Sequence, residues 1–239
     1  IGVRLVGSEM CIRDRDYKVP FGFLGEIVDK ILGGRLVKQR IDRMFKAREI
    51  RLQRDLQAHE KYRSIPRKKI LIAGSSGLIG TQMVAFLDTG GHDVYRLVRR
   101  KVENDFEIEW DPDNGVINAK EIEGFDAVIH LGGEGIGDKR WSKKRKEKIL
   151  TSRTGSTALL AKTLSQIDDP PEVFMVASAV GYYGHSQEEN LTEESELGSG
   201  YLPDVCSAWE KSAQPAVDAG IRTISVSYTH LRAHETYTY

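Results

Sequence analysis

The glycine-rich segment GSSGLIG, residues 74–80, constrains the fold more than any other stretch of the 239-residue chain. It follows a short apolar run, KKILIA at residues 68–73, and precedes a predicted helix at 81–89. A strand, a glycine turn and a helix in this order are typical of a dinucleotide-binding βα unit, in which the helix N-terminus offers backbone N–H groups to phosphates. The predicted cofactor contacts in this loop are Gly74, Ser75, Ser76, Gly77, Leu78, Ile79 and Gly80.

Apolar runs recur along the chain with helix-length spacers between them, the longest filled by a predicted helix at 142–166. Strands that alternate with such helices form a parallel sheet covered on both faces. The sequence therefore predicts an α/β fold, a Rossmann-type doubly wound parallel sheet over residues 68–226, preceded by a linker at 63–67. The other predicted strands are 93–98, 106–110 (followed by a DPDNG turn), 126–131, 173–177 and 222–226.

The two ends of the chain, GSEMCIRDR and VSYTHLRAHET, have neither helical nor strand periodicity and resemble translated sequencing-adapter read-through. We interpret residues 1–15 and 227–239 as non-native tails, with a pair of unusual native tails as the alternative. On this interpretation the native protein is cut at both ends and its Rossmann domain is incomplete. Residues 16–62 are predicted to form a long helix that packs on a domain, a membrane-surface helix being the less favoured alternative.

The composition excludes several classes of protein. Thirty-five basic and 35 acidic residues balance, which argues against a general nucleic-acid or membrane-surface binder. Cys11 and Cys206 show no metal-ligand spacing, so we expect no metal site and a reducing, cytoplasmic compartment. No apolar run approaches the roughly 20 residues that span a bilayer. The basic run at 139–148 invites a nucleic-acid function, but it has few aromatics, and a solvated helix face is favoured.

Two further features concern the cofactor. Arg99 and Arg100 follow the second strand, about 20 residues after the glycine loop, where an NAD-selective site has an acidic residue. A guanidinium there suits a 2′-phosphate, so NADP(H) is favoured over NAD(H); the alternative is a pair of exposed arginines at a strand end. After the fourth strand, a second glycine loop permits close approach by a ribose or nicotinamide, unless it is an ordinary loop. Its predicted contacts are Leu131, Gly132, Gly133 and Glu134.

The segments KILIAGSSGLIG, DAVIHLGGEGIGDKRWSKKRKEKILTSR, ASAVGYYG and CSAWEKSA occur in this order over residues 68–226. Together they resemble an atypical, epimerase-like group of the short-chain dehydrogenase/reductase superfamily, related to the bacterial YfcH protein. The resemblance implies a Rossmann domain that binds NADP(H), an unknown small-molecule substrate and a C-terminal substrate-binding part. Residues 16–62 resemble the tail of a START-like (SRPBCC) domain, which precedes the Rossmann domain in some members.

Ordinary members of the superfamily use a Ser, and a Tyr and Lys four residues apart on one helix face. No tyrosine of this chain has a lysine four residues later. Tyr201 and Lys211 are ten residues apart, about 15 Å along a helix and on different faces. When Glu210 is aligned with the acidic residue that often follows the family lysine, Leu202 and Cys206 occupy the Tyr and Lys positions.

The remaining catalytic candidates follow the fifth strand: Ser178, which is also a candidate cofactor contact, Tyr182 and Tyr183. An alignment on the tyrosine-glycine pair places Ala179 at the usual serine position instead, and the tyrosines could equally cover the sheet edge. Two functions stay open. One is an NADP(H)-dependent oxidoreductase or epimerase acting on a small carbonyl or sugar-like substrate. The other is an NADP(H)-binding sensor or regulatory module without turnover. In either case we expect this chain to be inactive by itself.

Overall fold

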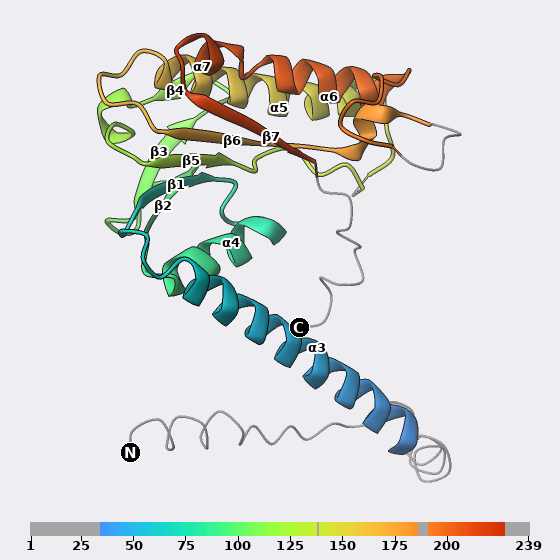
Figure 1. Cartoon of the computed structure of the whole chain (residues 1–239). Coiled ribbons are helices and arrows are strands. Elements are labelled where there is room, and N and C mark those ends of the chain that lie inside the picture. The colour runs from blue at the N-terminus through green and yellow to red at the C-terminus, as the bar shows by residue number, and fades with distance from the viewer. Residues whose placement is uncertain (1–33, 138, 186–190, 228–239) are drawn as a thin grey trace. The chain divides into compact units, whose positions relative to one another are not determined.

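The computed structural model describes residues 34–137, 139–185 and 191–227 (Figure 1). The chain divides into two units, 1–58 and 59–239, which we describe separately. Of the predicted helix at 16–62, the structure describes Gly34–Lys61 as helix α3, and residues 16–33 lie outside the described part. Phe45, Leu52 and Leu56 of α3 are each more than half exposed. The resemblance to a START-like tail stays a prediction.

The second unit carries the predicted sheet. Residues 62–68 form turns and irregular chain between α3 and the first strand, where the linker is predicted. Each predicted strand is present within one or two residues. The elements are β1 (Lys69–Ala73), α4 (Leu78–Thr89), β2 (Asp93–Val98), β3 (Glu107–Asp111), β4 (Val116–Ile117), η2 (Ala119–Glu121), β5 (Ala127–His130), α5 (Lys143–Leu164), β6 (Val173–Ser178), η3 (Val180–Tyr183), α6 (Tyr201–Lys211), α7 (Gln214–Asp218) and β7 (Arg222–Ser227).

The strands of the sheet are ordered β4-β3-β2-β1-β5-β6-β7. All neighbouring pairs are parallel except β3 with β4, where Trp110 lies opposite Ile117. The β4 strand was not predicted. It has only two residues, and it follows the predicted DPDNG turn, in which the Asp111 carboxylate accepts hydrogen bonds from the backbone of Asp113 and Asn114. A run this short has too few alternations to be recognised from the sequence.

Helices cover both faces of the sheet, as Figure 1 shows for α4 on one side and α5, α6 and α7 on the other. The arrangement follows from right-handed crossovers: the chain moves from β1 to β2 in one direction and from β5 through β6 to β7 in the other. The larger apolar cluster joins the sheet to α5–α7 through residues such as Leu160, Leu164 and Trp209. The smaller cluster joins it to α4 through Val84. The doubly wound α/β fold is therefore confirmed.

No described helix is long and apolar enough to cross a membrane.

The first turn of α4 lies so close to the glycine loop that a side chain cannot fit at Gly80. A Cβ atom there would be 2.2 Å from the carbonyl oxygen of Gly74. We predict that Gly80→Ala lowers the free energy of unfolding by about 2–4 kcal/mol, because backbone must move to admit the methyl group. The measurement is urea unfolding followed by circular dichroism.

Gly155→Ala is the matched control. Gly155 also lies inside a helix, α5, but its Cβ would meet nothing within 4 Å. Alanine there should raise stability by about 0.5–1 kcal/mol, because it favours the helix over the unfolded chain. Equal effects at the two positions would contradict the close approach of α4 to the loop.

Candidate cofactor site

The candidate site lies at the carboxyl ends of β1, β2 and β5. The chain winds outwards from β1 in one direction and from β5 in the other, so the switch point of the sheet lies between these two strands. In open parallel sheets, ligands bind outside the carboxyl ends of the strands at this point. Both predicted glycine loops begin here, because Gly74 follows β1 and Leu131 follows β5.

The first loop turns sharply and then opens directly into α4. Gly74 adopts a positive φ of 82°, which favours glycine, and the Gly77 N–H donates to the Gly74 carbonyl at 3.1 Å. Gly77 is the N-cap of α4 and supplies no side-chain hydrogen bond to the helix. The positive end of this helix dipole therefore has no side-chain cap, as an anion-binding loop requires.

The two glycine loops touch through their backbones. A Cβ at Gly74 would be 2.7 Å from the backbone nitrogen of Gly132 and from the carbonyl carbon of Leu131. The Leu131 N–H also donates to the carbonyl of Ala73 at 2.8 Å. The two loops thus meet through main chain at the switch point of the sheet.

Helix α5 holds the second loop from one side. The Glu134 N–H donates to the Ser152 hydroxyl at 3.0 Å, and Arg153 donates to the Glu134 carbonyl at 2.9 Å. The Glu134 carboxylate pairs with Arg145 and lies 3.5 Å from Lys148. The hydrogen bond from Arg145 lowers the pKa of this carboxyl below its ordinary value. Glu134, a predicted cofactor contact, therefore has its carboxylate bound to α5, while its backbone shapes the loop.

His130 also contacts the second glycine loop, and the sequence did not predict this role. It is the last residue of β5 and fully buried. The Ser156 hydroxyl donates to the Ser152 carbonyl at 2.7 Å, so the Nε2–H of His130 donates to the Ser156 oxygen at 2.8 Å. The Nδ1 atom then accepts from the Gly132 N–H at 3.4 Å. These bonds require a neutral imidazole, and burial, with the nearby Arg153 cation, lowers the His130 pKa to about 4.

The two arginines after β2 have different surroundings. Arg100 donates two hydrogen bonds to the Glu107 carboxylate, at 2.7 and 2.9 Å, and the Glu107 side chain is only 2% exposed. Arg99 is exposed and forms no hydrogen bond or ion pair with the described residues. The Arg100 guanidinium is therefore engaged with β3, whereas Arg99 has only a longer-range electrostatic interaction, with Asp111 at the end of β3.

Two residues of α6, Leu202 and Cys206, lie beside η3. A Cβ at Gly181 in η3 would lie 3.3 Å from the Cβ of Leu202 and 3.6 Å from the Cys206 sulfur. Leu202 and Cys206 thus face η3, and their assignment to the Tyr and Lys positions stays a prediction. Tyr201 and Lys211 are the first and last residues of α6, and the Tyr201 hydroxyl donates to the Lys146 carbonyl at 2.6 Å. They do not form a catalytic pair.

The catalytic candidates lie at the end of β6 and in η3. The Ser178 hydroxyl is buried and donates to the Glu210 carboxylate at 2.5 Å. Tyr182 and Tyr183 are half-buried and stack edge to face, with ring centres 5.4 Å apart. Burial raises the pKa of the Cys206 thiol, so this cysteine stays protonated at neutral pH and is a poor nucleophile.

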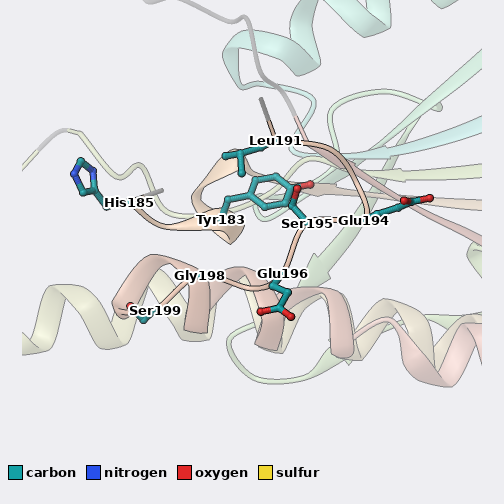
Figure 2. A pocket seen from close by; sticks show the side chains of 8 residues that line it. All are labelled: Tyr183, His185, Leu191, Glu194, Ser195, Glu196, Gly198 and Ser199. Carbon is teal, nitrogen blue, oxygen red and sulfur yellow. The ribbon is translucent and has the colours of Figure 1, made fainter. Parts of the chain in front are cut away.

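A hollow beside η3 adjoins Tyr183. Gly198 allows it to form, since a Cβ there would be 2.2 Å from the Tyr183 carbonyl oxygen. Figure 2 shows the carboxylates of Glu194 and Glu196 pointing away from the Tyr183 ring. The lining residues are Tyr183, His185, Leu191, Glu194, Ser195, Glu196, Gly198 and Ser199. Among the described residues, no group of three or more His, Cys, Asp and Glu side chains could hold a metal ion.

The buried histidine gives the site a measurable pH dependence. Below its ordinary pKa of about 6.5 the unfolded His130 takes up a proton that the folded protein excludes until about pH 4. The stability contributed by the neutral form is therefore complete above pH 6.5 and is lost as the pH falls towards 4. We predict that wild type loses about 2 kcal/mol relative to His130→Gln between pH 8 and pH 5, measured by urea unfolding. A constant difference across this range would contradict a neutral, buried His130.

Comparison with known proteins places the chain in a family. Residues 70–208, more than half of the chain, match the family described as NAD dependent epimerase/dehydratase. The epimerase family protein ML0860 of Mycobacterium leprae is 37% identical over 155 residues, which cover 65% of this chain and 50% of that protein. The human epimerase family protein SDR39U1 is 30% identical over 149 residues, which cover 61% and 49%. The chain spans about half the length of these curated relatives.

Solved structures agree with this assignment. The nucleoside-diphosphate sugar epimerase of Corynebacterium glutamicum superposes with a TM-score of 0.66 at 34% identity, covering 77% of this chain and 39% of that one. Human SDR39U1, solved with NADPH, gives a TM-score of 0.57 at 28% identity, covering 66% and 52%. The resemblance to the epimerase-like group of the short-chain dehydrogenase/reductase superfamily is confirmed. The chain belongs to the NAD dependent epimerase/dehydratase family.

Proposed function

We propose that this chain binds NADP(H) across the carboxyl ends of β1, β2 and β5. We further propose that the whole protein is an oxidoreductase or epimerase acting on a small carbonyl or sugar-like substrate. One observation carries the proposal: Gly74 and Gly132 are in backbone contact, so no side chain lies between the two loops where a dinucleotide would bind. A Cβ at Gly74 would enter this contact, and a Cβ at Gly132 would come within 2.9 Å of the His130 ring, so the two loops fit a ligand that lies directly on main chain.

Residues at the carboxyl ends of β1, β2 and β5 fit the separate parts of the cofactor. The uncapped N-terminus of α4, with the loop 74–80, suits the pyrophosphate. Arg99, exposed at the end of β2, suits a 2′-phosphate, and the loop 131–134 suits the ribose and nicotinamide. The human relative, which was solved with NADPH, supports the same choice of cofactor. When bound, the cofactor supplies hydride transfer.

A non-catalytic role is the second candidate, and one observation favours it. The face of α6 that would carry the acid–base pair presents Leu202 and Cys206 to η3. Neither side chain can hold or move a proton for a substrate oxygen at neutral pH, the first because it is apolar and the second because burial raises its pKa. On this alternative the protein binds NADP(H) as a sensor or regulatory module.

The cofactor preference is tested by titrating the chain with NADPH and NADH while its tryptophan fluorescence is followed. We expect NADPH to bind more tightly. Arg99→Gln should weaken NADPH binding about tenfold, about 1.4 kcal/mol, with little change for NADH, because only NADPH offers the 2′-phosphate. Arg222→Gln removes an exposed arginine from the amino end of β7 and should change neither affinity. An unchanged preference in Arg99→Gln would refute this role for Arg99, and failure to bind either cofactor would refute both candidate functions.

Turnover separates the two candidates. We expect the full-length protein to oxidise NADPH with at least one member of a panel of small aldehydes, ketones and nucleotide sugars, and this chain alone to show no turnover. The assay follows NADPH absorbance with saturating cofactor. Tight NADPH binding without oxidation across the panel favours the non-catalytic candidate. Turnover by this chain alone would show that the substrate pocket needs no further segment.

A further inference from the structure

Arg153 on α5 is a buried cation beneath the second glycine loop, and its surroundings are unusual for a structural arginine. Arg153 is only 8% exposed to solvent. Its guanidinium donates to the carbonyls of Glu134 at 2.9 Å and Ile149 at 3.0 Å, and its Cζ lies 5.1 Å from the centre of the Trp209 ring. A Cβ at Gly133 would be 3.1 Å from that Cζ atom. Backbone dipoles and an indole face thus surround the charge.

The charge is only partly compensated within the described chain. Arg153 forms no ion pair with the described residues, and the Glu134 carboxylate, which interacts with it electrostatically, is itself paired with Arg145 and Lys148. A buried charge without a counterion costs several kcal/mol, and burial accordingly lowers the Arg153 pKa. An arginine nevertheless stays charged at neutral pH. The fold therefore holds a permanent positive charge that no described side chain pairs with directly.

Two of the three nitrogen atoms of the Arg153 guanidinium form no hydrogen bond with the described residues. Both hydrogen bonds use Nη1, so the Nε–H and Nη2–H groups have no hydrogen bond to any described residue. Neither nitrogen is sealed from solvent. These two N–H groups lie along one edge of the guanidinium plane, which is the edge that binds two oxygens of a carboxylate or phosphate side by side.

The Arg153 charge lies near helix α6. Electrostatic interactions of Arg153 reach Cys206 and Tyr201 on α6. The sequence alignment predicts that Cys206 stands at the position of the family lysine, so a cation on α5 would lie near the place where ordinary members carry one on α6. Gly133 above it belongs to the loop that suits the nicotinamide side of the cofactor.

We propose that Arg153 is a substrate-binding residue whose Nε–H and Nη2–H edge binds an oxyanion, a carboxylate or phosphate group of the substrate, between the second glycine loop and α6. The proposal rests on the proposed function only in placing that substrate beside the cofactor. It narrows the substrate class from any small carbonyl compound to anionic ones. It also gives the site a fixed charge that orients the substrate without exchanging a proton.

The test uses this chain and two probes, malonate and inorganic phosphate, against sodium chloride at matched ionic strength. A ligand that binds only the folded state raises the melting temperature, and at 50 mM we expect a rise of about 3 °C with at least one probe. Arg153→Met keeps most of the stem and should abolish the rise. Arg222→Met, at the amino end of β7, should retain it. A rise with malonate only would show that the edge accepts a carboxylate, and a rise with phosphate only would show that it accepts a phosphate.

Two further measurements test the proposal if Arg153→Met does not fold. Arg153→Lys keeps the charge but loses the two-donor edge, and should lower the rise at least twofold. In Cys11→Ser protein, alkylation of Cys206 should slow about threefold when the probe binds, because a neutralised Arg153 no longer favours the thiolate.

An equal temperature rise in wild type and both Arg153 variants, or no rise with either probe, would overturn the proposal. A rise that disappears with saturating NADPH would assign the oxyanion to the cofactor and also overturn it. NADPH titration of the same samples reports on the proposed function separately. If NADPH binds but neither probe raises the melting temperature, only the role of Arg153 is refuted. If a probe raises the melting temperature but NADPH does not bind, only the cofactor site is refuted.

Discussion

The site depends on the contact between the backbone of α4 and the carbonyl of Gly74, where a Cβ at Gly80 would come within 2.2 Å. This approach sets where the helix N-terminus lies relative to β1. The same turn brings Gly74 against Gly132, so one glycine loop positions the other across the switch point of the sheet. Main-chain contacts have no rotamers to adjust, so Gly74 and Gly80 tolerate only glycine, whereas a Cβ at Gly132 would press on the buried His130 ring.

Helix α5 complements that contact from the opposite side of the second loop. Ser152, Arg153 and Ser156 lie within about one turn of this helix and bind, in order, the Glu134 N–H, the Glu134 carbonyl and His130. The first turn of α5 is basic, which the positive end of the helix dipole disfavours. The Glu134 carboxylate offsets this through Arg145 and Lys148. The second loop and the start of α5 therefore stabilise each other.

Sequence patterns predicted the parts of the molecule that are set by local chemistry. The glycine loop, the apolar strands and the missing Tyr–Lys pair each depend on residues within one turn or one strand. His130 and Arg153 escaped notice because their roles come from partners 26 and 19 residues away. A histidine at the last position of an apolar strand and the Ser152–Ser156 spacing were the available signals. Arg99 and Arg100 are equivalent in sequence, and only the buried Glu107 on β3 separates them.

The charges at the end of the sheet constrain what chemistry can occur there. Arg153 stabilises negative charge but cannot give up a proton at neutral pH. Cys206 keeps its proton because burial raises its pKa, and Ser178 is committed to the Glu210 carboxylate. The groups that remain for moving a proton are the hydroxyls of Tyr182 and Tyr183, the Glu210 carboxylate, and groups outside the described residues. Hydride transfer to a carbonyl needs such a group or water as well, because the alkoxide that forms must take up a proton. A fixed cation can orient an anionic substrate and stabilise its charge, but it does not supply that proton.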